Sequence, residues 1–116
     1  MLSICSKEEF EDCVKTTRLN KKRYVVVKFG AEWCGPCQNI APAFARLAKQ
    51  YKKYAQFVNV DIEEAMDNDW TEVGAVKRIP HFQFIAVTTH DKTDHCSTSD
   101  EHELENKLKS LLHILE

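Results

Sequence analysis

Three stretches of the chain are predominantly apolar and rich in β-branched or aromatic residues, and they predict strands at residues 24–30, 57–62 and 82–87. Such largely apolar segments are typical of strands that are buried on both faces of a sheet. Two weaker strands are predicted, a short edge strand at residues 2–5 and a polar strand at residues 94–98.

Apolar residues spaced three or four positions apart predict helices between these strands. The first helix begins after Ser6, which forms a capping box with Glu9. The longest covers residues 34–53 and contains Pro42, which should kink it. A short acidic helix is predicted at residues 64–73.

The last helix is predicted to begin near residue 100, where Thr98 and Glu101 form a second possible capping box. Its leucines recur at helical spacing and form one apolar stripe. The stripe consists of Leu104, Leu108, Leu111, Leu112 and Leu115.

The predicted elements follow one another in the order β-α-β-α-β-α-β-β-α. Helices between apolar strands indicate a layered α/β domain in which a sheet is covered on both faces. The closing β-β-α segment adds an antiparallel edge. Because the 116 residues contain no repeat and no linker rich in glycine or proline, a single domain over residues 1–116 is expected.

Composition argues against several classes of protein. The net charge is −2 and the pI about 6.2, whereas a general nucleic-acid binder is usually basic. No apolar run exceeds four residues, so no membrane-spanning helix is predicted. The charged residues Lys7, Glu8 and Glu9 argue against a secretory signal. Five cysteines are too few for a disulfide scaffold, and a cytoplasmic, reducing compartment is expected.

The candidate chemistry lies in Trp33-Cys34-Gly35-Pro36-Cys37, between a predicted buried strand and the longest helix. Unpaired N–H groups and the dipole at a helix N-terminus favour an anion, so they lower the pKa of Cys34 and supply thiolate. The spacing brings Cys37 within disulfide distance in the first helical turn. Pro36 suits that turn, and Gly35 leaves Cys34 uncovered. Cys34 can therefore attack a target disulfide, and Cys37 can resolve the mixed disulfide.

Two other interpretations of the cysteine pair remain open from the residues alone. One is half of a structural zinc site, which needs two further ligands, usually in a second close pair. The other histidines and cysteines do not offer that spacing. The second interpretation is a pair of buried structural thiols. The order of strand, motif and helix favours redox chemistry, for which neither a metal nor an organic cofactor is expected.

The sequence resembles the thioredoxin family over nearly its whole length. The resemblance rests on Val25-Val26-Val27, Phe29, Ala31 and Glu32 leading into the WCGPC motif, and on Arg78-Ile79-Pro80-His81-Phe82. It implies a central mixed sheet flanked by helices and a reductase of protein disulfides that takes part in electron transport and cell redox homeostasis. It also implies disulfide-containing protein substrates and an NADPH-dependent thioredoxin reductase as electron donor. We expect a monomer that binds neither nucleic acid nor membrane.

The resemblance also implies roles for individual residues. Cys34 and Cys37 would be the attacking and resolving thiols. Trp33 would cover the site and contact partners beside Gly35 and Pro36. Ile79 would offer its backbone to an extended target segment, and Pro80 would be cis, holding the loop tightly against the cysteines.

The sequence departs from the family in three places. Lys28 stands where the family has a buried Asp, and Asn59 where it has an accompanying Lys. Lys28 either perturbs Cys37 or extends to solvent without a role. Residues 88–99 contain no glycine, so the groove near the site should have a polar lip at Ser97 or Thr98. Arg78 either places a positive charge at the substrate groove or is simply solvated.

The sequence therefore predicts a thioredoxin-fold dithiol–disulfide oxidoreductase. One alternative is a redox specialist with the same fold that serves a single partner. The other is a non-catalytic interaction module in which the motif is present but turnover is negligible.

Overall fold

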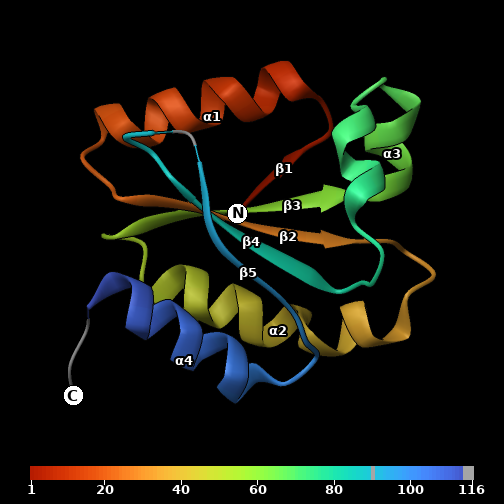
Figure 1. Ribbon diagram of the computed structural model, residues 1–116. Helices are drawn as coiled ribbons and strands as arrows, with labels where there is room; N and C mark the ends of the chain where they lie inside the picture. The colour runs from red at the N-terminus through yellow and green to blue at the C-terminus, as the bar shows by residue number, and fades with distance from the viewer. Residues whose placement is uncertain (90, 114–116) are drawn as a thin grey trace.

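The computed structural model describes residues 1–89 and 91–113, and it contains one mixed sheet of five strands in the order β1-β3-β2-β4-β5 (Figure 1). Strands β1, β3 and β2 are parallel to one another, whereas β4 runs antiparallel to both of its neighbours, β2 and β5. The strands are β1 (Leu2–Ile4), β2 (Tyr24–Gly30), β3 (Ala55–Asp61), β4 (His81–Ala86) and β5 (Lys92–Ser97).

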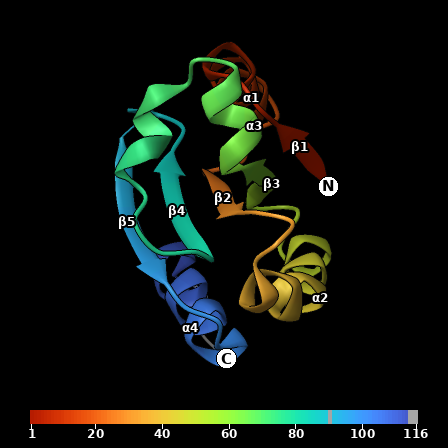
Figure 2. The same ribbon diagram turned by 90° about the vertical axis from the view of Figure 1, so that its right-hand side faces the viewer.

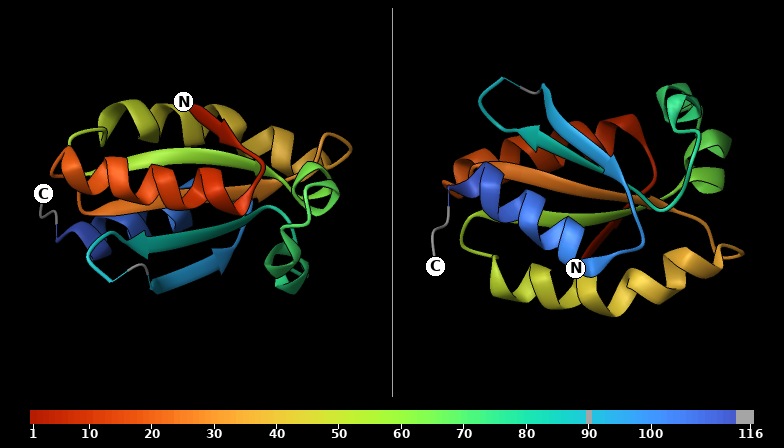
Figure 3. Two further views of the ribbon diagram at one scale, coloured as in Figure 1. Left: turned by 90° about the horizontal axis from the view of Figure 1, so that it is seen from above. Right: turned by 60° about the horizontal axis from the view of Figure 1, so that its bottom comes forward.

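In the described part of the chain, four α-helices and one short 3₁₀ helix flank the sheet. They are α1 (Lys7–Leu19), α2 (Gly35–Gln50), α3 (Ile62–Asp67), η1 (Thr71–Ala75) and α4 (Glu101–Leu112). α1 lies over one face, and α2 and α4 lie side by side under the other (Figures 1 and 3). The expected central mixed sheet with helices on both faces is confirmed.

The alternation of side chains along β2 builds two cores. Val25, Val27 and Phe29 pack with α1 and α3, whereas Val26 packs with α2 and α4. Because successive side chains of a strand point to opposite faces, Lys28 lies on the face that α2 covers. A positively charged side chain therefore occupies a core-facing position of a central strand.

One predicted helix start and one predicted cap are wrong, and both errors come from an aspartate that caps a helix, whereas the predicted start of the last helix near residue 100 is confirmed. Asp61 accepts hydrogen bonds from the N–H groups of Glu63 and Glu64, so α3 begins two residues before the predicted position. Asp100, not the predicted Thr98–Glu101 capping box, caps α4 and accepts from the N–H groups of residues 102 and 103. A short Asp side chain satisfies two free donors at once, which explains its advantage.

The single helix predicted at residues 64–73 is also wrong. The segment divides into α3 and η1, and Asp69 between them has a φ of 60°. A left-handed residue cannot continue an α-helix, and aspartate tolerates that conformation better than most residues. The polar strand β5 begins at Lys92, two residues earlier than predicted. In the predicted leucine stripe of the last helix, Leu115 lies outside the described residues.

Candidate active site

Cys34 and Cys37 lie at the junction between β2 and α2, at the end of the sheet that faces the viewer in Figure 2. Cys34 is the N-cap of α2, and its Sγ accepts a hydrogen bond of 3.1 Å from the Cys37 N–H. The two cysteines form a disulfide with their Cα atoms 5.2 Å apart, and Pro36 lies in the first turn. The predicted placement is confirmed, and the same N–H can stabilise a Cys34 thiolate after reduction.

The disulfide is almost enclosed. Cys34 is 5% exposed and Cys37 only 1%. A Cβ on Gly35 would meet no atom within 4 Å, so this position is open as expected, but the prediction that Cys34 is uncovered is wrong. Ala31, Ile62 and Ile79 pack against the pair. Gly35 is exposed and leaves open space next to Cys34 in the chain.

Trp33 places a large apolar side chain directly before Cys34 in the chain. It is 68% exposed, the most exposed large apolar side chain near the disulfide. Its indole Nε1 donates a hydrogen bond to the carboxylate of Glu63 at the start of α3. The sequence did not reveal this contact, because the two residues are 30 positions apart.

A groove of about 160 Å³ begins at Pro36 and follows the loop before β4. The Ile79–Pro80 peptide bond in its wall is cis, as expected. Arg78 is exposed there and has no ion-pair or hydrogen-bond partner among the described residues. The predicted polar lip is present. The groove is lined by Pro36, Arg78, Ile79, Pro80, Ser97, Thr98 and Ser99.

A second hollow, of about 140 Å³, lies on the other side of Cys37. Lys28 lines it and is only 8% exposed, and burial lowers the pKa of its ammonium group below the usual value of a lysine. Lys28 and Asn59 are register partners across β2 and β3, as the resemblance implied. The hollow is lined by Lys28, Gly30, Ala31, Glu32, Cys37, Gln38, Asn59, Val60 and Asp61.

Gly30 is a site residue that sequence reasoning missed. A Cβ at this position would lie 3.2 Å from Cys37 Sγ and 3.4 Å from Cys37 Cβ. The absence of a side chain therefore lets Cys37 pack against the end of β2. A glycine that ends a buried strand four residues before the first motif cysteine was the available signal.

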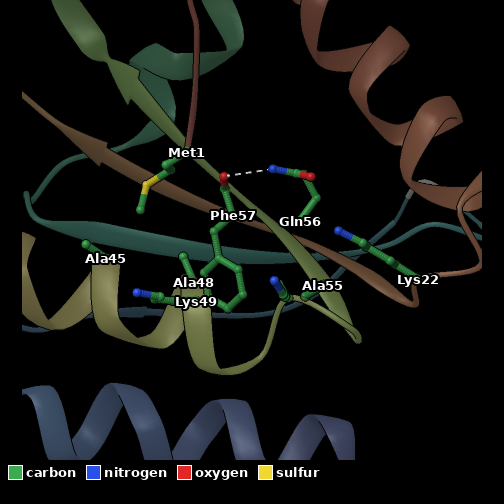
Figure 4. Close-up of a pocket in the computed structure, with 9 residues that line it drawn as sticks. Met1, Lys22, Ala45, Ala48, Lys49, Ala55, Gln56 and Phe57 are labelled. Atoms are coloured by element: carbon green, nitrogen blue, oxygen red, sulfur yellow. Dashed lines mark hydrogen bonds between the residues drawn. The ribbon is translucent and has the colours of Figure 1, made fainter.

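Other candidate groups lie away from the disulfide. A hollow of about 310 Å³ near the C-terminal end of α2 has Lys22 and Lys49 on opposite sides of an apolar floor that includes Phe57 (Figure 4). Cys96 is half-buried, and burial raises the pKa of its thiol to about 11. In the described part of the chain, no three His, Cys, Asp or Glu side chains are placed to hold a metal ion, and no helix is long and apolar enough to cross a membrane.

Comparisons with known proteins agree with this geometry. The family model described as Thioredoxin matches residues 2–110. A thioredoxin of Equus caballus is 34% identical over 110 residues, which cover 92% of this chain and 94% of that protein. Thioredoxin H4-2 of Oryza sativa subsp. japonica is 32% identical over 110 residues, covering 93% of this chain and 77% of that protein.

Solved structures show the same similarity in three dimensions. A wild-type poplar thioredoxin h has a TM-score of 0.84 at 27% identity, with 98% of this chain and 97% of that chain covered. A thioredoxin of Fasciola hepatica has a TM-score of 0.78 at 31% identity, with 95% and 98% covered. The close cysteine pair has the placement that dithiol–disulfide exchange needs. The chain belongs to the thioredoxin family and is a dithiol–disulfide oxidoreductase.

Proposed function

We propose that the chain reduces protein disulfides by a two-thiol mechanism in which Cys34 attacks and Cys37 resolves. The observation that carries this assignment is the hydrogen bond from the Cys37 N–H to Cys34 Sγ at the N-terminus of α2. That donor and the helix dipole favour a thiolate at Cys34, whereas Cys37 lies deeper.

Electrons and protons balance over the two steps. The Cys34 thiolate attacks one sulfur of the target disulfide, so a mixed disulfide forms and one target thiolate leaves. The Cys37 thiolate then attacks Cys34 Sγ, which forms the Cys34–Cys37 disulfide and releases the second target thiolate. Two electrons have passed from the dithiol to the target. The released thiolates take up protons from water.

Regeneration of the dithiol requires an external donor. We assign this role to an NADPH-dependent thioredoxin reductase, which would return two electrons to the Cys34–Cys37 disulfide. The chain itself would need no metal and no organic cofactor. We propose that residues 1–116 form one domain, that the protein acts in the cytoplasm and that it is a monomer. The three cysteines outside the disulfide are free, which supports a reducing compartment.

The target would bind across the opening of the site. Trp33, Gly35 and Pro36 would contact it on one side, and Arg78, Ile79 and Pro80 on the other. Ile79 is half-buried at the groove, where its backbone groups can pair with an extended segment. Recognition through main-chain hydrogen bonds would admit many target sequences, which supports a general reductase over a single-partner specialist.

A trapping experiment tests the assignment. Cys37→Ser should form a stable mixed disulfide with a disulfide-containing protein such as insulin but should lose multiple turnover. Cys34→Ser should form no adduct and reduce nothing. Cys96→Ser, which removes a half-buried thiol away from the pair, should behave as the unsubstituted protein. Adduct formation by Cys34→Ser, or undiminished turnover by Cys37→Ser, would contradict the two-thiol mechanism.

A further inference from the structure

Lys28 is the charged side chain that the fold places most unusually. It occupies a core-facing position of β2, and its 8% exposed fraction is far below that of an ordinary surface lysine. The hollow that it lines is also lined by Cys37, which comes from α2 on the same face of the sheet. A cation and the second cysteine of the redox pair therefore share one small cavity.

The Lys28 ammonium group is not fully occluded. Within residues 1–89 and 91–113, the Lys28 side chain makes no hydrogen bond and no ion pair. No fully occluded side-chain nitrogen or oxygen in that part of the chain lacks a hydrogen-bond partner. The Lys28 Nζ must therefore keep some accessible surface, and the hollow beside Cys37 is the space that the side chain lines.

The other charged groups around the cavity do not neutralise Lys28. Asn59, its register partner on β3, is uncharged and donates its amide to Met1 Sδ. Asp61 accepts hydrogen bonds from two N–H groups at the start of α3. Glu32 is exposed, so water screens its charge. Neither carboxylate lies within ion-pair distance of Lys28.

We propose that Lys28 is a positioning residue for the redox reaction, whose ammonium group favours the thiolate of Cys37 and so speeds the resolution of mixed disulfides. This inference rests on the proposed roles of Cys34 and Cys37. An opposite charge close to a thiol favours the ionised form. Inside a partly buried cavity this attraction is screened less than at the surface.

The step is balanced without any further reactant. A cavity of about 140 Å³ has room for several waters. The Cys37 thiol passes its proton to that water, and the thiolate attacks Cys34 Sγ of the mixed disulfide. The Cys34–Cys37 bond forms, and the departing target thiolate takes a proton from solvent. Lys28 keeps its own proton throughout.

The size of the effect follows from two opposing trends. If the charge lowers the Cys37 pKa by about one unit, the thiolate fraction below that pKa rises about tenfold. The nucleophilicity of the thiolate falls by about threefold over the same unit, because the Brønsted coefficient is about 0.4–0.5. The net gain is about threefold near neutral pH. It should fade at alkaline pH, where Lys28 loses its proton earlier than an exposed lysine does.

Lys28→Met tests the proposal, because it removes the charge and keeps the length of the side chain. Reduced protein is mixed with an aromatic disulfide, dithiobis-nitrobenzoate, in a stopped-flow instrument. Attack by Cys34 and resolution by Cys37 each release one coloured thiolate, so the two steps appear as separate phases. Lys28→Met should resolve about threefold more slowly near neutral pH, with its pH midpoint raised by about one unit and its attack phase unchanged.

Two further variants make the test specific. Asn59→Asp retains Lys28 but places a carboxylate opposite it, and it should shift the resolution profile in the same direction. Lys53→Met removes an exposed lysine after α2 and should change neither phase. If resolution has the same pH profile in Lys28→Met and in the unsubstituted protein, the inference is wrong although the two-thiol mechanism stands. If no second phase occurs in either protein, the two-thiol mechanism itself fails.

Discussion

The two hollows beside the Cys34–Cys37 disulfide have similar volumes, about 140 and 160 Å³, but they hold positive charge in different ways. Lys28 belongs to β2 and is nearly buried on the face that α2 covers, whereas Arg78 is exposed in the loop before β4. Salt and water screen an exposed charge strongly and a partly buried one much less. We therefore expect the buried cation to act on thiol chemistry and the exposed cation to act on the encounter with targets.

The two sides also differ in how tightly the backbone approaches the cysteines. On the enclosed side, a Cβ on Gly30 would lie 3.2 Å from Cys37 Sγ, and on the open side a Cβ on Gly35 would meet nothing within 4 Å. Neither glycine has a positive φ, so backbone strain does not explain the choice of glycine at either position. Packing alone distinguishes the two positions.

The largest effect is expected for Gly30→Ala, which tests this difference directly. The added methyl group must displace Cys37, which α2 and the disulfide hold in place, and overpacking of this kind typically costs about 1–3 kcal/mol. Gly35→Ala is the matched control and should change the free energy of unfolding by less than about 0.5 kcal/mol. Denaturant unfolding of the oxidised proteins measures both. Equal stability of the two variants would show that Cys37 shifts to accept the methyl group of Gly30→Ala without a measurable cost in unfolding free energy.

Much of this arrangement could be predicted from the sequence, because local signals and the fold agree. The apolar run of β2 and the glycine-proline pair between the cysteines located the redox pair at a strand–helix junction, and the family resemblance of the Ile79–Pro80 segment located the groove. Each of these signals lies within a few residues of the feature that it determines. The family resemblance also placed Lys28 at the end of a buried strand, with Asn59 on the neighbouring strand, and the register of β2 and β3 pairs the two residues.

The missed features depend on contacts between distant segments or on competition between neighbouring caps. The Trp33–Glu63 hydrogen bond joins a loop to α3, and only the packed structure brings the two together. Asp100 competes with Thr98 for the start of α4, and both residue types are good caps. The sequence also left open whether Lys28 reaches solvent, because its exposure depends on α2 and β3 together.

A smaller effect is expected at Arg78, on the open side. Peptide disulfides flanked by Asp or Glu should be reduced about two- to fivefold faster than Lys-flanked ones at low ionic strength, since a nearby exposed charge contributes up to about 1 kcal/mol. Arg78→Gln should remove the difference, and so should 0.5 M salt, at which the screening length falls to about 4–5 Å. Lys77→Gln changes the adjacent exposed cation, which donates to the Gly74 carbonyl, and serves as the control. A preference that persists in Arg78→Gln would assign it to another residue.

The smallest effect concerns His81, which follows Pro80 in β4 and is half-buried. Its Nδ1 lies 2.7 Å from Ser97 Oγ, and its ring lies 5.6 Å from that of His95. Burial, followed by the charges of His95 and Lys92, lowers the pKa of His81 below its usual value of 6.5. The folded protein therefore binds a proton at His81 less readily than the unfolded chain does. Its contribution to stability is complete above about pH 6.5 and is lost as the pH falls below that value.

Acidification from about pH 7.5 to 5.5 should therefore destabilise the unsubstituted protein more than His81→Gln. The difference should be less than about 1 kcal/mol, because solvent screens a charge that is only partly buried. Carboxylates that titrate over this range contribute equally to both proteins and cancel in the comparison. His102→Gln removes an exposed histidine from α4 and is the matched control, expected to follow the unsubstituted protein. Denaturant unfolding at the two pH values provides the measurement. If His81→Gln loses as much stability as the unsubstituted protein, the open side of the site contributes no pH dependence through this histidine.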